Sequence, residues 1–193
     1  MSRTLYLARH GETAWNALGR WQGQTDVELN EAGRAQAQVL AQAVNGRGIE
    51  QVWASDLARA RETAEIVAAH LGLGPVTVDA GLRERAFGCF EGLTREECEA
   101  RFPEHWSRYR SNLREVPPGG EAHTAVVPRM HAAMLRAAGG LGEGGAALLV
   151  SHGAAIRLAI GEITGEVPGP LGNGALFGVR VEGDRFGVVE RIV

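Results

Sequence analysis

The sequence predicts an α/β fold, because apolar segments typical of short buried strands alternate with segments of helical periodicity along most of the chain. Two of the strand-like segments end in the same way: residues 5–8 run into Arg9-His10-Gly11, and residues 146–150 run into Ser151-His152-Gly153. Strand ends of an α/β sheet can face each other across a ligand-binding crevice. The repeated pattern therefore predicts that His10 and His152 share one site. A histidine that merely caps a strand is the structural alternative.

The segment after His10 predicts a binding loop followed by a long helix. Residues 13–16 are expected to form the first turn of a helix or a tight loop. Residues 19–26 are polar and punctuated by glycine, which is typical of loops that carry binding groups. Asn30 is the predicted N-cap of a helix that ends at Asn45-Gly46.

The next unit is predicted to be a strand, a helix and a short third strand. Residues 51–54 form the strand, and Ser55-Asp56 cap a helix over 57–71 with one continuous apolar face. Arg59 lies off that face in the first helical turn, where backbone N–H groups and the helix dipole also favour an anion. Residues 75–79 predict the third strand.

From residue 82 to residue 120 the regular alternation is lost, which indicates an insertion. A capping box at Thr94 and Glu97 predicts one short helix, and Pro103 opens another. We expect a single domain over residues 1–193, with a helical lid inserted at about residues 84–120. A purely structural excursion is the alternative to a lid.

The last part of the chain returns to helices and strands. A helix with a core-packing stripe is predicted at Val126, Met130, Met134 and Ala137. Residues 140–145 match G-x-G-x-x-G, but they precede a strand instead of following one, so they predict only a flexible turn. A helix over 154–163 follows the second histidine, and residues 175–181 and 186–192 predict a hairpin.

Composition and charge disfavour several classes of partner. The formal net charge is −3 without long runs of one sign, which argues against nucleic acid and anionic membranes. All 20 residues counted as lysine or arginine are arginine, so neither a phosphate-binding-loop lysine nor a Schiff-base lysine is present. Cys89 and Cys98 form neither a disulfide framework nor a zinc motif. We expect a cytoplasmic monomer or homodimer.

The candidate site residues favour an anion over a metal ion. Histidines and carboxylates can hold zinc or iron, but Arg9 and Arg59 beside them would repel a cation. Forked guanidinium groups and imidazolium donors match the oxygens of a phosphate monoester, and the same donors stabilise a phosphoryl group during transfer. A small-molecule phosphomonoester is therefore the predicted substrate.

His10 is the predicted nucleophile, because a neutral imidazole with an ordinary pKa of roughly 6.5 can attack phosphorus near neutral pH. Gly11 is expected to let a bulky ligand approach closely, and His152 to donate to the phosphoryl oxygens. The leaving oxygen needs a proton, and Glu84 is better placed to give it than Glu12, which we expect to hold the first loop. A solvated surface charge is the alternative for both glutamates.

Seven short segments support a more specific assignment. They are Arg9-His10-Gly11-Glu12-Thr13 with Asn16, residues 19–23, residues 55–60, Leu82-Arg83-Glu84, residues 87–92, residues 118–121 and Ser151-His152-Gly153. Together, and in this order, they resemble the histidine phosphatase superfamily in its phosphoglycerate-mutase-like branch. The resemblance extends over nearly the whole chain.

The resemblance implies a three-layer α/β/α sandwich with a mostly parallel mixed sheet, and it implies neither a metal nor an organic cofactor. It makes His10 the phosphorylated nucleophile and Glu84 the proton donor. The phosphate pocket that it implies consists of Arg9, Asn16, Gln22, Arg59 and His152. Gly23 and Gly153, which belong to the same motifs, are included among the predicted substrate-binding residues.

The resemblance favours a broad-specificity phosphatase over a mutase. Arg20-Trp21-Gln22-Gly23 stands where cofactor-dependent mutases of the family have Phe-Thr-Gly-Trp, and those mutases are generally longer. Ala122-His123 and Arg85-Ala86 depart from the usual pattern near the lid, which affects substrate choice more than phosphoryl chemistry. A cofactor-dependent phosphoglycerate mutase and a non-catalytic phosphate-binding protein are the alternatives.

Overall fold

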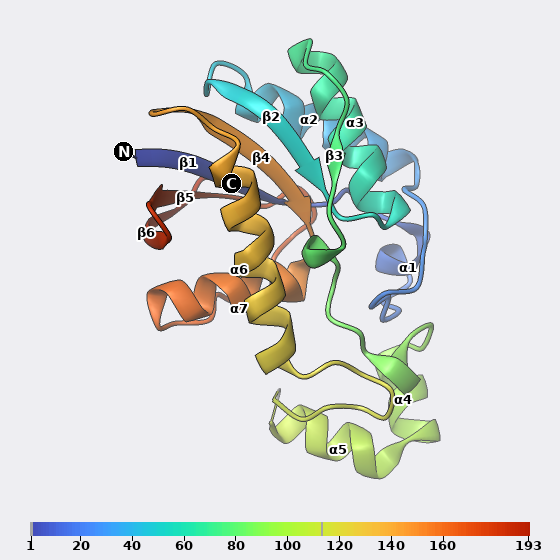
Figure 1. The fold of residues 1–193 in the computed structure, drawn as a ribbon. Coiled ribbons are helices and arrows are strands. Elements are labelled where there is room, and N and C mark those ends of the chain that lie inside the picture. The colour runs from blue at the N-terminus through green and yellow to red at the C-terminus, as the bar shows by residue number, and fades with distance from the viewer. Residues whose placement is uncertain (1, 113) are drawn as a thin grey trace.

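Six strands form one mixed sheet at the centre of the molecule (Figure 1). The computed structural model describes residues 2–112 and 114–193. The strands, in the spatial order β3-β2-β4-β1-β5-β6, are β3 (Thr77–Val78), β2 (Ile49–Ala54), β4 (Ala146–Ser151), β1 (Ser2–Arg9), β5 (Leu176–Glu182) and β6 (Arg185–Arg191). The predicted mostly parallel mixed sheet is confirmed, since β3, β2, β4 and β1 pair in parallel, while β5 pairs antiparallel with β1 and β6 pairs antiparallel with β5.

The register between β1 and β4 places the two predicted histidines side by side. Leu7 pairs with Leu149, and Arg9 pairs with Ser151. Because the strands are parallel and end at paired residues, the residues that follow them leave the sheet at the same edge. His10 N donates a hydrogen bond to Ser151 O over 3.0 Å, which continues the pairing one residue beyond the strand.

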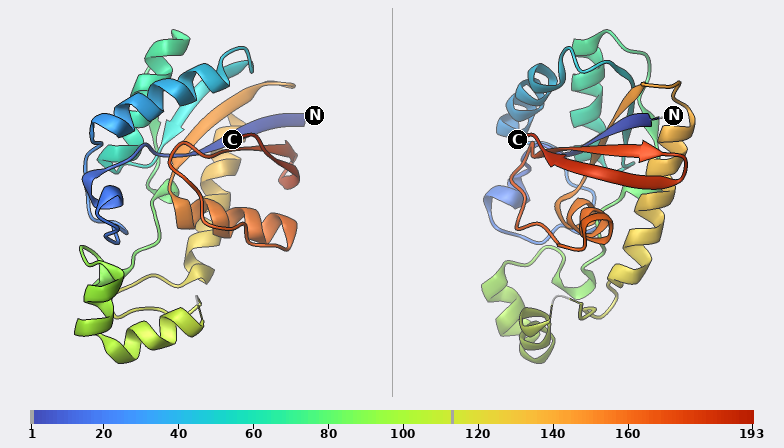
Figure 2. Two further views of the ribbon diagram at one scale, coloured as in Figure 1. Left: turned by 180° about the vertical axis from the view of Figure 1, so that it is seen from behind. Right: turned by 90° about the vertical axis from the view of Figure 1, so that its left-hand side faces the viewer.

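Helices cover both faces of the sheet (Figures 1 and 2). On one face α2 (Glu31–Val44) and α3 (Ala58–Leu71) enclose a core that includes Ala8, Val52 and Val150. On the other face α6 (His123–Gly139) and α7 (Gly153–Thr164) enclose a second core with Leu5, Leu7 and Leu149. All six residues of β4 are buried, as expected of a strand covered on both sides. The predicted three-layer α/β/α sandwich is therefore confirmed.

The segment between β3 and α6 contains short helices and a small core of its own. It has two 3-10 turns, η1 (Ala80–Leu82) and η2 (Gly88–Phe90), and two helices, α4 (Arg95–Arg101) and α5 (Pro103–Ser111). The predicted capping box at Thr94 and Glu97 and the helix that opens at Pro103 are both confirmed. Phe90, Trp106 and Tyr109 pack together there, separately from the two cores beside the sheet.

Two local predictions need correction. The first turn of α3 is not capped by Ser55-Asp56: its N-cap is Leu57, which makes no side-chain cap, and Ala58 N donates instead to Asp26 Oδ1 at 2.7 Å. The Asp56 carboxylate forms an ion pair with Arg83 instead of capping the helix. The third strand is two residues long instead of five, because only residues 77 and 78 at the sheet edge pair with β2. The hairpin between β5 and β6 is confirmed, with Gly183 in the turn at φ 59°.

A short tight helix, α1 (Ala14–Ala17), follows the first strand, as the sequence predicted. Thr13 caps it, and Thr13 and Asn16 form a capping box. Within the described residues, no helix has both the length and the apolar character needed to cross a lipid bilayer.

Candidate active site

His10 and His152 lie next to each other at the edge of the sheet where β1 and β4 end. The centroids of their rings are 5.1 Å apart, and the ring planes are tilted by 57°. His10 is 3% exposed and His152 is fully buried. The prediction that the two strand-end histidines face one site is therefore consistent with their placement, although only His10 lines the adjoining cavity.

The hydrogen bonding of His10 sets its tautomer. His10 Nδ1 is 2.6 Å from Gly11 O, and because a carbonyl oxygen can only accept, Nδ1 must carry a proton. Burial, with smaller contributions from Arg59 and Arg9, lowers the pKa of the His10 imidazole well below its ordinary value. The ring is therefore neutral at neutral pH, and its Nε2 is left with a lone pair.

His152 is neutral for the same reasons. Burial is the largest cause that lowers its pKa, and Arg59, His10 and Arg9 lower the pKa further. Imidazolium donors were expected from the sequence, whereas in this environment His152 can offer one N–H from a neutral ring. Both of its ring nitrogens are buried without a hydrogen-bonding partner among the described residues.

Two arginines bring positive charge to the same place. Arg59, fully buried in the first turn of α3, donates from Nη1 to Thr25 O at 2.9 Å and from Nη2 to Gly23 O at 2.7 Å. Burial lowers the pKa of its guanidinium to about 10, so Arg59 stays charged at neutral pH. Arg9 donates from Nη1 to Leu171 O. The Nε atoms of both arginines are buried and, in the part of the chain that is described, have no hydrogen-bonding partner.

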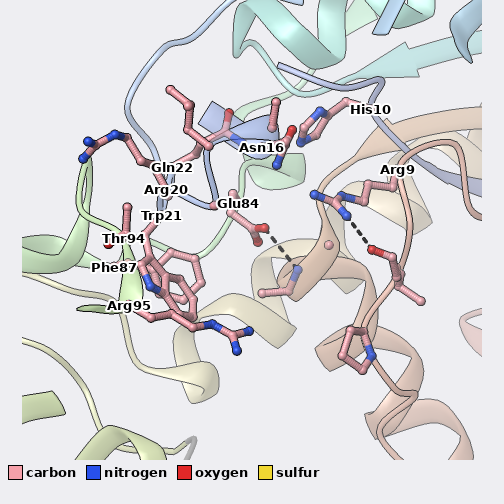
Figure 3. Close-up of a pocket in the computed structure, with 18 of the residues that line it drawn as sticks. Arg9, His10, Asn16, Arg20, Trp21, Gln22, Glu84, Phe87, Thr94 and Arg95 are labelled. Atoms are coloured by element: carbon pink, nitrogen blue, oxygen red, sulfur yellow. Dashed lines mark hydrogen bonds between the residues drawn. The ribbon is translucent and has the colours of Figure 1, made fainter. Parts of the chain in front are cut away.

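Asn16 and Gln22 present their amide groups from the loop after β1. Thr13 N donates to Asn16 Oδ1 at 3.1 Å, and Thr13 Oγ1 donates to Gln22 Oε1 at 3.0 Å. With both amide oxygens held by Thr13, the NH2 groups are the ends left to donate to a ligand. Asn16 and Gln22 both line the cavity, as Figure 3 shows.

Glu84 enters the cavity from the segment after η1 and is held by the N-terminus of α7. Its Oε1 accepts hydrogen bonds from Arg85 N and Ala155 N, both at 2.8 Å, and its Oε2 accepts one from Ala154 N at 3.1 Å. Figure 3 shows this carboxylate between His10 and the aromatic side chains of Trp21 and Phe87. The carboxyl group is therefore placed on the side of His10 that faces these aromatic side chains (Figure 3).

The cavity has a volume of about 670 Å³ and opens to solvent. It is lined by every predicted site residue except His152, namely Arg9, His10, Asn16, Gln22, Gly23, Arg59, Glu84 and Gly153. Residues that were not predicted to belong to the site also line the cavity, among them Thr94, Arg157 and Leu171. Leu171 precedes β5, and the sequence carries no signal for its place, because that depends on the antiparallel pairing of β5 with β1.

The glycines of the site lie in close contact with neighbouring groups, as the distances from an added Cβ show. A Cβ on Gly11 would lie 2.3 Å from Gly33 O, so Gly11 lets the loop after β1 pack against α2. Gly11 is not among the residues that line the cavity, and its role in ligand approach stays a prediction. A Cβ on Gly23, which has φ 51°, would lie 2.0 Å from Glu91 Oε1. Gly153 leaves space for Arg9, whose Nε would be 3.4 Å from an added Cβ.

The expected role of Glu12 agrees with its contacts. Asn30 Nδ2 donates to Glu12 Oε1 at 2.8 Å, and Glu12 N donates to Gln36 Oε1 at 2.8 Å, which ties the loop to α2. Among the residues that the structure describes, no group of three or more histidine, cysteine, aspartate or glutamate side chains is arranged to hold a metal ion.

Chemically, the arrangement joins a neutral imidazole with a free lone pair to several donors that lack partners. Buried polar groups without partners are rare in folded proteins, so a set of them around one nucleophile indicates a site for a ligand with acceptor oxygens. Two guanidinium groups beside that nucleophile select for negative charge. The geometry and charge fit a tetrahedral oxyanion such as a phosphoryl group.

Comparisons with known proteins agree with this geometry. The model of the histidine phosphatase superfamily (branch 1) matches residues 5–191. Phosphoglycerate mutase-like protein 4 from Arabidopsis thaliana is 42% identical over 156 residues, which are 79% of this chain and 67% of the relative. A mycobacterial glucosyl-3-phosphoglycerate phosphatase, solved with VO3, superposes with a TM-score of 0.83 at 31% identity over 92% of each chain.

A solved structure named a putative α-ribazole-5′-P phosphatase, from Escherichia coli, superposes with a TM-score of 0.83 at 25% identity, over 98% of this chain and 95% of that one. The match to the family model covers both strand-end histidines, both arginines and Glu84. The chain belongs to the histidine phosphatase superfamily, branch 1.

Proposed function

We propose that this protein hydrolyses small organic phosphomonoesters through a covalent phosphohistidine at His10. The observation that carries the proposal is the neutral, Nδ1-protonated His10 beside the unpartnered Nε atoms of Arg9 and Arg59. A phosphoryl group at His10 Nε2 would supply acceptor oxygens to donors that are otherwise buried without partners. The names of the structural neighbours, which include two phosphatases, support the same reaction class.

In the first step His10 Nε2 attacks phosphorus, the N–P bond forms, and the bond from phosphorus to the ester oxygen breaks. Arg9, Arg59, and a single N–H from neutral His152 bind the three phosphoryl oxygens as negative charge shifts onto them. The carboxyl group of Glu84 donates its proton to the departing oxygen, so that an alcohol leaves instead of an alkoxide. Gly11 O keeps the Nδ1–H of the phosphorylated ring in place.

In the second step a water molecule takes the position that the alcohol has left. The carboxylate of Glu84 accepts a proton from that water as its oxygen attacks phosphorus, and the N–P bond breaks. Inorganic phosphate forms, His10 returns to the neutral ring, and Glu84 is again protonated. Every group in the cycle belongs to the chain or the substrate, so we propose that the reaction needs no metal ion and no organic cofactor.

A mutase differs from a phosphatase only in what accepts the phosphoryl group from His10. The similarity to a phosphoglycerate mutase-like protein keeps this second candidate open. A phosphatase must admit water to the phosphorylated His10, whereas a mutase must exclude water and hold a second hydroxyl group there. We favour the phosphatase because the cavity over His10 opens to solvent.

The test measures the hydrolysis of p-nitrophenyl phosphate with a strong chelator present. We expect turnover to persist with the chelator, to be inhibited by orthovanadate, and to vanish in His10→Asn. Brief reaction with labelled substrate, quenched in alkali, is expected to leave acid-labile label on the protein, and His10→Asn should carry none. Turnover that depends entirely on added metal, or full activity in His10→Asn, would contradict the proposal.

The same preparation separates the two candidates. 3-Phosphoglycerate is supplied with and without a bisphosphoglycerate primer, and both inorganic phosphate and 2-phosphoglycerate are measured. We expect phosphate release without dependence on the primer. Primer-dependent formation of 2-phosphoglycerate without phosphate release would identify the mutase instead.

A further inference from the structure

Glu84 belongs to a segment without regular secondary structure, so its position is not set by a helix or strand of its own. It lies between the 3-10 turns η1 and η2. Its carboxylate is held by α7, as described above, but this holds only the far end of a flexible side chain. What fixes the main chain of Glu84 therefore decides how far its carboxyl group can move relative to His10.

One side chain from α6 holds the main chain of this segment at three points. Arg129 donates from Nη1 to Gly81 O at 2.9 Å and to Arg83 O at 2.6 Å, and from Nη2 to Glu84 O at 2.9 Å. The carbonyl groups of residues 81, 83 and 84 therefore converge on one guanidinium. A planar group with donors in fixed directions sets the relative positions of such carbonyls more tightly than a flexible ammonium would.

Glu121 fixes the orientation of that guanidinium. Arg129 donates from Nε to Glu121 Oε1 and from Nη2 to Glu121 Oε2, both at 2.8 Å. The two side chains are only 21% and 19% exposed. Burial alone would raise the pKa of the Glu121 carboxyl, but the hydrogen bond and the charge of Arg129 hold it below its ordinary value. The pair is therefore charged at neutral pH and shaped as a fork on a carboxylate.

Other elements of the site hold the same segment. Gln24 Nε2, from the loop after β1, donates to Glu84 O at 3.1 Å, and Ser151 Oγ, at the end of β4, donates to Leu82 O at 2.8 Å. Ser151 is directly followed by His152. The segment is thus tied to the strand that carries one histidine, and Arg129 closes the remaining side from α6.

We propose that Arg129, oriented by Glu121, is a positioning residue that holds the proton donor Glu84 at the distance from His10 needed for protonation of the leaving oxygen. The proposal rests on the proposed function of Glu84. Arg129 is not among the residues that line the cavity, so it acts on the reaction through the backbone of residues 81–84.

The proposal predicts a loss that depends on the leaving group. Protonation matters most for an alkyl phosphate, whose alkoxide is a poor leaving group, and little for p-nitrophenyl phosphate, whose phenolate leaves without a proton. The constant to measure is kcat/KM, because it reports the steps up to formation of the phosphoenzyme. It is independent of the later hydrolysis, which is common to both substrates.

The test variant replaces both partners, as Arg129→Gln with Glu121→Gln, so that no buried charge is left unpaired. Glycerol 3-phosphate is compared with p-nitrophenyl phosphate. We expect kcat/KM for the alkyl substrate to fall by roughly 10- to 100-fold, the range for a catalytic group displaced by about 1 Å, and that for the aryl substrate to change by less than about threefold. The ratio of the two constants does not depend on how much of the variant is folded.

Glu84→Gln and Arg136→Gln serve as references. Arg136 lies on the same helix and forms a similar fork with Asp79, with hydrogen bonds of 2.8 and 3.0 Å, but it donates to no carbonyl of residues 81–84. We expect Arg136→Gln to leave the ratio of kcat/KM for glycerol 3-phosphate to kcat/KM for p-nitrophenyl phosphate unchanged. Glu84→Gln is expected to lower this ratio most. If kcat/KM of the double variant fell equally for both substrates, or did not fall, the proposal would be overturned. A ratio unchanged in Glu84→Gln would instead refute the role of Glu84 itself.

Discussion

At the scale of single residues, the position of His10 depends on two glycines that touch across the interface between the first loop and α2. An added Cβ on Gly11 would lie 2.3 Å from Gly33 O, and one on Gly33 would lie 2.1 Å from Glu12 O. Neither contact leaves room for any side chain. The carbonyl of Gly11 also accepts the hydrogen bond from His10 Nδ1, so the packing of this glycine and the tautomer of the nucleophile are linked.

This contact predicts the effect of Gly11→Ala. The methyl group would meet backbone atoms that cannot rotate away, so the loop must shift, and we expect a loss of about 1–3 kcal/mol in the free energy of unfolding, typical of overpacking. Displacement of Gly11 O should also lower kcat by weakening its hold on His10. Urea denaturation and steady-state kinetics on p-nitrophenyl phosphate measure the two effects.

Gly139→Ala is the matched control for that substitution. Gly139 is the last residue of α6, and an added Cβ there would meet nothing within 4 Å. We expect the free energy of unfolding of Gly139→Ala to stay the same or to rise by up to about 1 kcal/mol, because alanine restricts the unfolded chain more than glycine does. Equal stability of Gly11→Ala and Gly139→Ala would show that the loop yields without strain.

Some residues of the site could be predicted from the sequence and others could not. His10 and Arg59 could be predicted because each follows directly from a strand end or a helix start, which local patterns reveal. Glu84 could be predicted only from its place in the loop that opens the insertion and from the family resemblance, because its segment has no periodicity. Arg129 and Leu171 were missed because their partners are distant in the sequence. The carbonyl groups that accept from Arg129 lie 45 to 48 residues away, and Arg9, which donates to Leu171 O, lies 162 residues away.

At the scale of elements, the loop over residues 19–26 joins three parts of the molecule. Glu91 accepts hydrogen bonds from Gln24 N at 3.2 Å and Thr25 N at 3.0 Å, which ties the loop to the segment that contains η2. Arg20 pairs with Glu97 on α4. Asp26 caps α3, and Arg59 on α3 donates back to the loop at Gly23 O and Thr25 O.

The cap at the start of α3 predicts the effect of Asp26→Ala. Without the Asp26 carboxylate, Ala58 N has no acceptor at the helix terminus. We expect the free energy of unfolding to fall by about 0.5–2 kcal/mol, the usual cost of removing an N-cap. Because the same loop binds Arg59, KM for phosphomonoesters is expected to rise as well. Chemical denaturation and KM are the two measurements.

Glu28→Ala provides the comparison for Asp26→Ala. Glu28 is an exposed acid two residues after Asp26 and carries the same charge, but Ala58 N donates to Asp26 and not to Glu28. We expect a change within about 0.5 kcal/mol, as for most surface substitutions. If the two variants were equally stable, the hydrogen bond from Ala58 to Asp26 would contribute nothing and the assignment of the cap would be wrong.

The elements were predicted well where the signal is local and poorly where it is not. The capping box of α4, the proline start of α5 and the apolar stripe of α6 are properties of adjacent residues, and all three are confirmed. The cap of α3 comes from a residue 32 positions earlier, so the nearby Ser55-Asp56 pair was chosen wrongly. The length of β3 is set by its pairing with β2, which propensity alone does not reveal.

At the scale of the whole molecule, the sheet brings two buried, uncharged imidazoles together where β1 and β4 end, beside the guanidinium groups of Arg9 and Arg59. His10 and His152 both have pKa values well below the ordinary value, mainly because of burial. In the unfolded chain neither burial nor this arrangement exists, so both rings would titrate near the ordinary histidine pKa of 6.5. Folding therefore makes both histidines harder to protonate.

That difference predicts how stability depends on pH. Below pH 6.5 the unfolded chain binds protons that the folded chain does not, so the free energy of unfolding falls as the pH falls, and it stops falling once the folded histidines protonate. Each histidine contributes a slope of up to about 1.4 kcal/mol per pH unit. Carboxyl groups with lowered pKa values, such as those of Asp56 and Asp79, act in the same direction only at lower pH, near and below the ordinary aspartate pKa of 3.8.

The measurement is urea denaturation between pH 7.5 and pH 5 in a buffer free of phosphate, since a bound oxyanion would stabilise the folded state and favour protonated rings. His152→Asn removes one of the two groups and is expected to reduce the slope below pH 6.5 by about half. A slope that is the same in the wild-type protein and in His152→Asn would mean that His152 is protonated as readily in the folded protein as in the unfolded chain. A positive charge on His152 would then lie beside His10, with the ring centroids 5.1 Å apart, and the single N–H that a neutral His152 donates in the proposed reaction would have to be abandoned.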